Sequence, residues 1–252
     1  MSRQWIGALL SFGIAAGTSP VFGDSHLGDP QMVVLVAGAS GRTGKHAVAY
    51  LRERGIPVRA LTRDPERARK NVAADYDWLR GDVGDPQSLD AALQGVTHVI
   101  GAMGSSSRDP SNSPESVDHL GVVNLTDAAK RAGVKHVILI SAMGVTRTDA
   151  MEPGHMRNLL ALKLKGEDYL RASGVNYTVI RPGGLDTSPA GEDGLAISQG
   201  DGGGDGMLSR QDLARVAIEC LTNPAALNKT FEITGGKAGD PDAWREDLRG
   251  LQ

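Results

Sequence analysis

The chain has 252 residues, of which 40% are hydrophobic and 4% aromatic, and its 27 Lys and Arg against 30 Asp and Glu give a formal net charge of −3. This length suits one large or two small α/β domains. Without a basic patch or aromatic platforms, nucleic-acid binding is not expected. The single cysteine, Cys220, excludes an intramolecular disulfide, and six scattered histidines without C-x-x-C or H-E-x-x-H patterns predict no metal site.

The first 23 residues have the features of a secretory signal peptide. Arg3 precedes an apolar segment over residues 5–16, and residues 21–23 are a candidate cleavage site. The segment is too short to span a bilayer comfortably, so no stable membrane insertion is expected. Residues 24–31 read as a polar linker. Export would place the protein in the periplasm or outside the cell, whereas a start codon further downstream would leave it cytoplasmic.

Residues 32–63 read as a strand, a glycine-rich turn, a helix and a second strand, which is one βαβ unit. Aliphatic residues 33–36 lead directly into the sequence GASGRTG at residues 38–44. A helical pattern follows as far as Gly55, and residues 58–61 form the next apolar run. The order of these segments predicts the first unit of a nucleotide-binding sheet.

The glycines of this turn have a physical purpose. A residue without Cβ lets the chain reverse from strand to helix and lets a pyrophosphate approach the backbone. The free N–H groups and the dipole of the helix then face the phosphates. Glycines spaced G-x-x-G-x-x-G are weak evidence alone, but between a buried strand and a helix they predict dinucleotide binding. The alternative is a tight turn that binds nothing.

Arg63 bears on which dinucleotide is bound. NAD-preferring folds usually carry Asp or Glu at the end of the second strand, to hold the ribose 2′-OH. This chain has Thr62-Arg63 there, and a guanidinium suits a 2′-phosphate by charge and geometry. Arg42 adds a second positive group, while Asp64 argues in the other direction. We therefore expect NADP(H), with NAD(H) as the alternative. If Arg63 does not bind the cofactor, it is a solvated turn residue.

The rest of the chain continues the alternation of strands and helices. This pattern predicts an α/β fold of the Rossmann type, with a doubly wound, mostly parallel sheet that binds ligands at its carboxyl edge. Strands are expected at residues 76–79, 97–101, 137–140, 176–180, 195–198 and 229–234, and helices at 86–93, 113–132, 157–172, 210–221 and 241–248, with one more beginning at Asp64-Pro65.

Several residues at the expected carboxyl edge are candidates for ligand contact. Asp82 can accept a hydrogen bond from an adenine amino group while Val83 packs on the ring, although a surface turn explains both residues as well. Residues 105–114 are expected to form a loop at this edge. Residues 186–206 are rich in glycine and acids and are expected to form a flap with a short strand.

Five blocks of the sequence together resemble the atypical short-chain dehydrogenase/reductases, and most closely their NmrA-like, NAD(P)H-binding branch, which includes flavin reductases of the biliverdin-reductase-B type. The resemblance covers residues 32–236 and implies one NAD(P)-binding Rossmann domain over 32–252, with a small C-terminal substrate lobe at about 183–236. The blocks are GASGRTG, TRDPERA, GDVGDPQSL, ISAMG and KLKGEDYLRASGVNYTVIRPGGL.

The resemblance also implies roles for individual residues. The phosphates would be held by Gly38, Ser40, Gly41, Arg42, Thr43 and Gly44, the 2′-phosphate by Arg63, and the adenine by Asp82 and Val83. Ala102 and Met103 would line the ribose path, Ser141 and Lys163 would flank the nicotinamide ribose as the candidate catalytic pair, and Pro182, Gly183 and Gly184 would lie on the nicotinamide side.

One departure from the family pattern concerns the proton donor. Typical members carry Tyr-x-x-x-Lys, in which the tyrosine gives the proton. Here Leu159 stands four residues before Lys163, and leucine has no proton to give. Two functions follow: an NADPH-dependent reductase of a small planar acceptor such as a flavin or quinone-like ring, or a non-catalytic redox sensor or scaffold. A sugar-nucleotide epimerase fits less well. Either protein would be a monomer or homodimer.

The candidate catalytic pair has simpler explanations as well. If the two residues have no catalytic role, Lys163 is a solvated lysine on a helix and Ser141 is a cap at the end of a strand. His155, just before the helix that carries Lys163, is a further candidate for contact with the acceptor.

Overall fold

The computed structural model describes residues 31–72, 76–105, 112–191, 194–237 and 240–252. The expected signal peptide, the linker as far as residue 30 and the middle of the loop at 105–114 lie outside these ranges. Within them, none of the helices combines the length and hydrophobicity needed to cross a bilayer.

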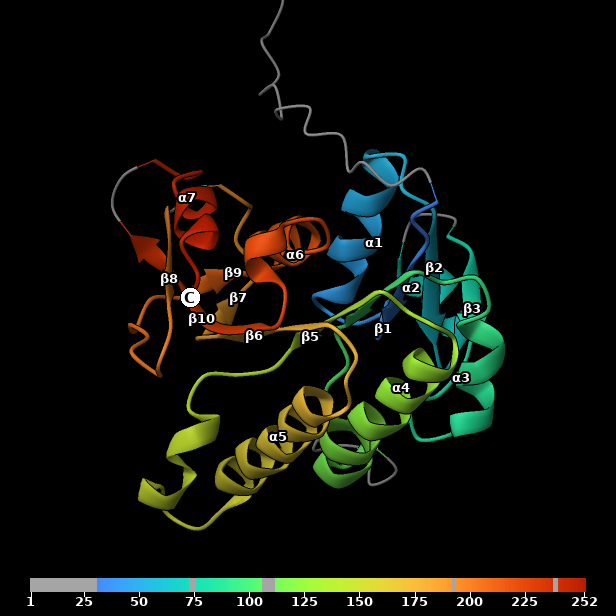
Figure 1. Cartoon of the computed structure of the whole chain (residues 1–252), viewed down its shortest axis with the longest axis horizontal. Helices are drawn as coiled ribbons and strands as arrows, with labels where there is room; N and C mark the ends of the chain where they lie inside the picture. The colour runs from blue at the N-terminus through green and yellow to red at the C-terminus, as the bar shows by residue number, and fades with distance from the viewer. Residues whose placement is uncertain (1–30, 73–75, 106–111, 192–193, 238–239) are drawn as a thin grey trace, which may run out of the picture.

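In the described part of the chain, an eight-stranded sheet forms the centre of the molecule (Figure 1). Its order is β3-β2-β1-β4-β5-β6-β10-β8, and every neighbouring pair is parallel except β10 and β8. This confirms the predicted doubly wound, mostly parallel sheet. The strands are β1 (Val34–Ala37), β2 (Val58–Thr62), β3 (Trp78–Arg80), β4 (His98–Gly101), β5 (His136–Ile140), β6 (Tyr177–Pro182), β8 (Gly194–Ser198) and β10 (Lys229–Lys237).

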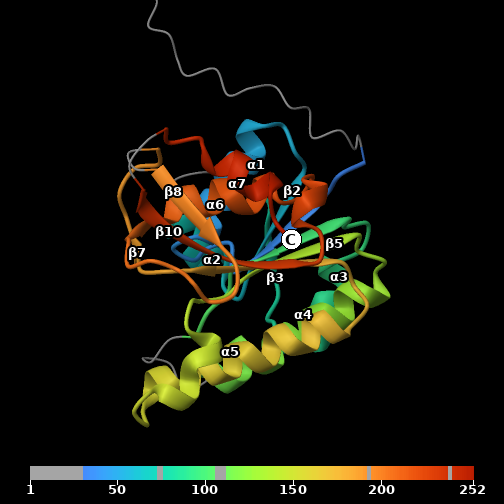
Figure 2. The same cartoon turned by 60° about the vertical axis from the view of Figure 1, so that its left-hand side comes forward.

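Helices cover both faces of the sheet, and Figure 2 shows the two layers from the side. One face packs against α1 (Gly44–Glu53), α2 (Pro65–Asn71), α6 (Arg210–Glu219) and α7 (Trp244–Arg249), and the other against α3 (Pro86–Ala92), α4 (Leu120–Arg131) and α5 (His155–Ala172). Each face has its own hydrophobic core, so the strands are buried on both sides, as a parallel sheet requires.

Local sequence explains where two of these helices begin. The side chain of Asp64 accepts a hydrogen bond from Arg67 N at 3.0 Å, and Pro65 occupies the first helical position of α2, as predicted. Ser209 caps α6 by accepting from Gln211 N at 3.2 Å. These caps fix helix starts next to the ends of β2 and of a two-residue strand, β9 (Leu208–Ser209), which pairs with β7 (Leu185–Asp186).

A π-helical turn over Glu115–His119 precedes α4. The sequence does not predict this turn. The turn carries Val117 and Asp118, both of which are buried. Helix α5 packs closely against this turn at Gly166. A Cβ added to Gly166 would lie 2.7 Å from Asp118 O, so only glycine fits at this contact. Such turns are frequent at functional sites, and this one brings an acidic side chain next to the carboxyl edge of the sheet.

Candidate functional site

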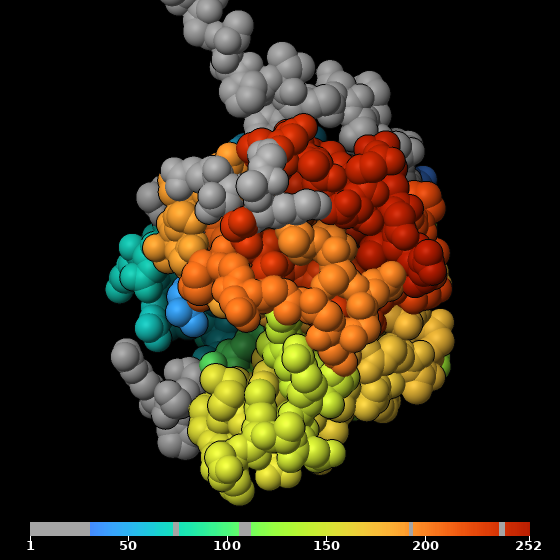
Figure 3. All heavy atoms as spheres, turned by 90° about the vertical axis from the view of Figure 1, so that its left-hand side faces the viewer, coloured from blue at the N-terminus to red at the C-terminus, as the bar shows by residue number. Residues whose placement is uncertain are grey.

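A cavity of about 180 Å³ lies where β1, β2, β3 and β4 end. On one face of the molecule, blue atoms of the N-terminal part lie recessed between the orange C-terminal part and the yellow segment near residue 150 (Figure 3). The cavity walls come from the segments that follow the four strands, namely Gly38, Ser40, Gly41, Leu61, Thr62, Arg63, Gly81, Asp82, Val83, Ala102, Met103 and Gly104, together with Asn112 and Val117. The position is the one expected for a ligand of a doubly wound sheet.

The glycine-rich turn leaves bare backbone at one end of this cavity. Gly38 has φ +79°, and a Cβ there would lie 2.8 Å from both Ala102 O and Met103 N. A Cβ on Gly44 would lie 2.2 Å from Gly38 O. The turn therefore excludes side chains at these positions, and the residues present fit the close approach of a pyrophosphate to a helix start.

Arg63 lies at the second-strand side of the cavity, and its side chain is exposed. Its carbonyl oxygen accepts from Arg80 Nη1 at 3.2 Å, so two arginines lie at this end. Ser40 Oγ and Thr62 Oγ1 are hydrogen-bonded at 2.9 Å, which joins the glycine turn to β2. Asp64 is engaged as the cap of α2. Of Arg63, Asp64 and Arg80, Arg63 is the one that lines the cavity.

The segment after β3 forms another wall. Asp82 Oδ1 accepts from Gly84 N at 2.8 Å, and Asp82 N donates to Ser88 Oγ at 3.0 Å. These contacts hold Asp82 half-buried beside the buried Val83 in the cavity lining. An aliphatic side chain next to a carboxylate is an arrangement suited to a flat ring with an amino group.

A second cavity, of about 10 Å³, adjoins the first and shares Met103 and Val117 with it. Ser141 and Lys163 both line this second cavity, so the structure brings the candidate catalytic pair together. Lys163 Nζ lies 2.6 Å from Asp118 Oδ1. Asp118 Oδ2 accepts from Ser105 N at 3.1 Å, which holds the carboxylate in place. Leu159, one helical turn before Lys163, offers no proton.

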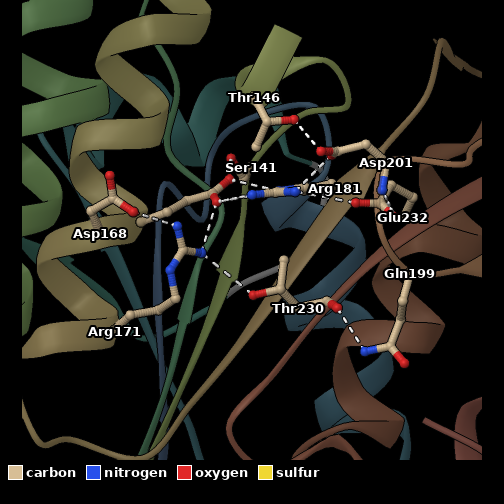
Figure 4. A network of polar contacts seen from close by, with 10 residues as sticks. Ser141, Thr146, Asp168, Arg171, Arg181, Gln199, Asp201, Thr230 and Glu232 are labelled. Carbon is tan, nitrogen blue, oxygen red and sulfur yellow. Dashed lines mark hydrogen bonds and ion pairs between the residues drawn. The ribbon is translucent and has the colours of Figure 1, made fainter. Parts of the chain in front are cut away.

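Ser141 belongs to a buried polar network, shown in Figure 4. Its Oγ donates to Glu167 Oε1 at 2.5 Å, and Glu167 is fully buried on α5. Arg181, at the end of β6, donates from Nη2 to Glu167 Oε2 at 2.8 Å. The same guanidinium donates to Asp201 and Glu232, and burial raises the pKa of the Glu232 carboxyl. The network thus connects the candidate site with the glycine-rich segment around Asp201.

Other predicted site residues line neither cavity. Thr43 is buried at the start of α1, and Arg42 is exposed beside it. A Cβ on Gly184 would lie 2.5 Å from Met207 Sδ, so this glycine is packed against the segment before β9. His155 is exposed at the start of α5. The predicted residues outside both linings are Arg42, Thr43, Gly44, His155, Pro182, Gly183 and Gly184.

Two acidic residues that the structure places at the site, Asp118 and Glu167, are not predicted from the sequence. Glu167 has Lys163 and Arg171 four residues away on either side, so its side of α5 carries charged residues and gives no clear signal of burial. Asp118 lies four residues before the core residue Val122, and an acid among apolar residues needs a partner once it is buried. The partners are fixed by how α5 packs against the π-helical turn and against the sheet.

Comparison with known proteins agrees with this geometry. The family model described as NAD(P)H-binding matches residues 38–224. The chain is 30% identical to sanguinarine reductase of Eschscholzia californica over 86% of this chain and 93% of that protein. It is 27% identical to NAD(P)H azoreductase of Xenophilus azovorans over 82% of this chain and 69% of that protein.

Among solved structures, a putative NAD-dependent epimerase/dehydratase from Bacillus halodurans superposes with a TM-score of 0.74 at 25% identity, covering 85% of this chain and 99% of that one. The match agrees with the Rossmann-type fold. Together with the family match, which spans more than half of the chain, it shows that the protein belongs to the NAD(P)H-binding family of Rossmann-type oxidoreductases.

Proposed function

We propose that the protein is an NADPH-dependent reductase of a small planar acceptor. The observation that carries this proposal is that the two cavities are adjacent, with Met103 and Val117 in the walls of both. The first has the glycine turn, Arg63 and Asp82 in its walls, and the second has Ser141 and Lys163. A dinucleotide in the first cavity would therefore extend toward the candidate catalytic pair.

The preference for NADPH is inferred from the charges at the end of β2. Arg63 lines the cavity, whereas Asp64 is outside its lining and accepts from Arg67 N as the cap of α2. A 2′-phosphate would instead meet a guanidinium, which binds phosphate by charge and geometry.

The acceptor class is inferred from the lack of the tyrosine proton donor. The reduced nicotinamide supplies a hydride. Lys163 is paired with Asp118, the Ser141 proton is directed to Glu167, and Leu159 replaces the tyrosine. A ring that spreads the charge of the added hydride, such as a flavin or quinone-like ring, then takes its proton from water. The two named relatives are reductases, which supports reduction in general.

The alternative is a non-catalytic NADP(H) sensor or scaffold, and Leu159 favours it. Anaerobic NADPH oxidation separates the two functions, with quinones, flavins and azo dyes as one set of acceptors and simple aldehydes and ketones as the other. We expect turnover with ring acceptors and none with simple carbonyl compounds. NADPH binding without turnover of any acceptor would contradict the reductase and support the sensor.

A further inference from the structure

We propose that Glu167 is a positioning residue that makes Ser141 a hydrogen-bond acceptor for the nicotinamide half of the cofactor. This inference rests on the proposed NADPH binding and goes beyond it, because it assigns a direction to the Ser141 hydrogen bond. It starts from the arrangement of donors around the two carboxylate oxygens of Glu167.

The two oxygens have different partners. Glu167 Oε2 accepts from Arg181 Nη2 at 2.8 Å and from Arg171 Nη1 at 3.0 Å. Glu167 Oε1 accepts from Ser141 Oγ at 2.5 Å. Arg181 Nε lies between the two oxygens, at 3.3 Å from Oε1 and 3.2 Å from Oε2. The partners of both oxygens in the described structure are O–H or N–H donors, and the guanidinium groups can only donate, so Glu167 acts as the hydrogen-bond acceptor.

The direction of the serine hydroxyl follows. A hydroxyl has one hydrogen and two lone pairs, and the Ser141 hydrogen is directed at Glu167. Only lone pairs remain for the cavity that Ser141 lines with Lys163 and Met103. Ser141 therefore recognises a donor. The nicotinamide half of the cofactor offers two kinds, the carboxamide N–H and the ribose hydroxyls. Ser141 does not give its proton to the acceptor.

Exchanging the carboxylate for an amide should reverse this polarity. In Glu167→Gln, the amide oxygen is held where Oε2 lies, because guanidinium donors of Arg171 and Arg181 converge there. The amide NH2 then faces Ser141 Oγ and donates to it. The serine hydrogen turns toward the cavity, where it meets the donor of the cofactor instead of accepting from it. The predicted effect is a reversal of one hydrogen bond at the site, with little change in shape.

A matched control lies in the same network. Glu232 is 1% exposed in its side chain and contacts the same guanidinium, with Arg181 Nη1 at 3.2 Å from Glu232 Oε1. It has no contact with Ser141 in the described structure. Glu232→Gln therefore removes one buried carboxylate from Arg181 without touching the serine. A loss of function that comes only from weakening the network should appear equally in both variants.

The experiment measures the Kd of NADPH and of its reduced 3-acetylpyridine analogue, in which a methyl ketone replaces the carboxamide. Cofactor fluorescence is followed with the full chain as wild type, Ser141→Ala, Glu167→Gln, Glu232→Gln and the Ser141→Ala/Glu167→Gln double variant. We expect Glu167→Gln to weaken NADPH binding about tenfold, Glu232→Gln to stay within about twofold of wild type, and the double variant to bind like Ser141→Ala.

The analogue tests the donor, because it lacks the carboxamide N–H but keeps the carbonyl oxygen. Ser141→Ala that weakens NADPH binding but not analogue binding assigns the carboxamide N–H and supports the inference. Equal weakening of both places the contact at a group that the two cofactors share, and it supports the inference only if Glu167→Gln also loses more affinity than Glu232→Gln. If Glu167→Gln does not fold, the selective loss of NADPH binding in Ser141→Ala supports the inference and equal weakening counts against it. Unchanged binding of both cofactors by Ser141→Ala, or equal losses in Glu167→Gln and Glu232→Gln, overturns it. A wild type that binds neither NADPH nor NADH overturns the proposed function itself, which is a distinguishable failure.

Discussion

Lys163 Nζ lies 2.6 Å from Asp118 Oδ1, and the side chain of Asp118 is only 1% exposed. Removing one member of a buried ion pair leaves the other charge uncompensated, which costs about 3 kcal/mol or more. We expect Asp118→Asn to lower the free energy of unfolding by about that amount. The double variant Asp118→Asn/Lys163→Met should recover much of the loss, because no charge is then left unpaired.

Urea denaturation of these variants provides the measurement. Asp127→Asn is the matched control, since Asp127 lies on α4, which follows the π-helical turn of Asp118, and accepts from the Tyr169 hydroxyl at 2.7 Å near the surface. It should change stability by less than about 1 kcal/mol. Equal losses in Asp118→Asn and Asp127→Asn, or no recovery in the double variant, would show that the pair does not have this role.

The backbone at Gly38 leaves no room for a side chain, so we expect alanine there to weaken both stability and cofactor binding. Alanine at this position would be strained at φ +79° and would collide with the backbone of Ala102 and Met103. Gly55 is the matched control, because it has φ +68° and a Cβ added there would meet nothing within 4 Å. We expect Gly55→Ala to cost about 1 kcal/mol of stability and Gly38→Ala about 3 kcal/mol. Thermal unfolding together with NADPH titration tests this, and only Gly38→Ala should weaken cofactor binding.

We expect the free energy of unfolding to depend on pH because of the buried His136. Burial, followed by the nearby His98, lowers the pKa of His136 from 6.5 to about 4. Because the folded pKa lies below the unfolded one, the unfolded chain takes up the proton first as the pH falls. The free energy of unfolding is therefore unaffected by the protonation of His136 above pH 6.5. It falls as the pH drops from about 6.5 to about 4, by at most about 3 kcal/mol.

The measurement is the free energy of unfolding against pH for wild type and His136→Gln, since glutamine can keep a contact with Thr178 Oγ1, which lies 2.9 Å from His136 Nε2. The difference between the two proteins should shrink as the pH falls through this window. Parallel curves would mean that His136 titrates normally in the folded state.

The sequence predicts the parts of the structure that depend on local pattern. The turn at 38–44, the helix start at Asp64 and the cavity wall at Asp82 and Val83 all follow from residues close together in the chain. Arg63 reaches the cavity for the same reason, since the end of a parallel strand is fixed by the strand itself.

The contacts that the sequence does not predict depend on how helices pack. Asp118 meets Lys163 because a π-helical turn precedes α4 and Gly166 allows α5 to approach it. Glu167 meets Ser141 and Arg181 across the layer between α5 and the sheet. Ser141 and Arg181 are 26 and 14 residues away from Glu167 in the sequence. Neither secondary-structure propensity nor hydrophobic periodicity predicts contacts between residues so far apart.

The contact of Arg63 with a cofactor 2′-phosphate is tested by titrating the purified protein with NADPH and NADH, in wild type, Arg63→Ala and Arg69→Ala. Arg69 is the control, because it is exposed on α2 and pairs with Glu66 at 2.8 Å outside the cavity. We expect wild type and Arg69→Ala to bind NADPH about tenfold or more tightly than NADH, and Arg63→Ala to lose that preference. Equal affinity of the wild type for both cofactors, or a preference unchanged in Arg63→Ala, would contradict the assignment of the 2′-phosphate site. Binding of neither cofactor at millimolar concentration would contradict the account as a whole.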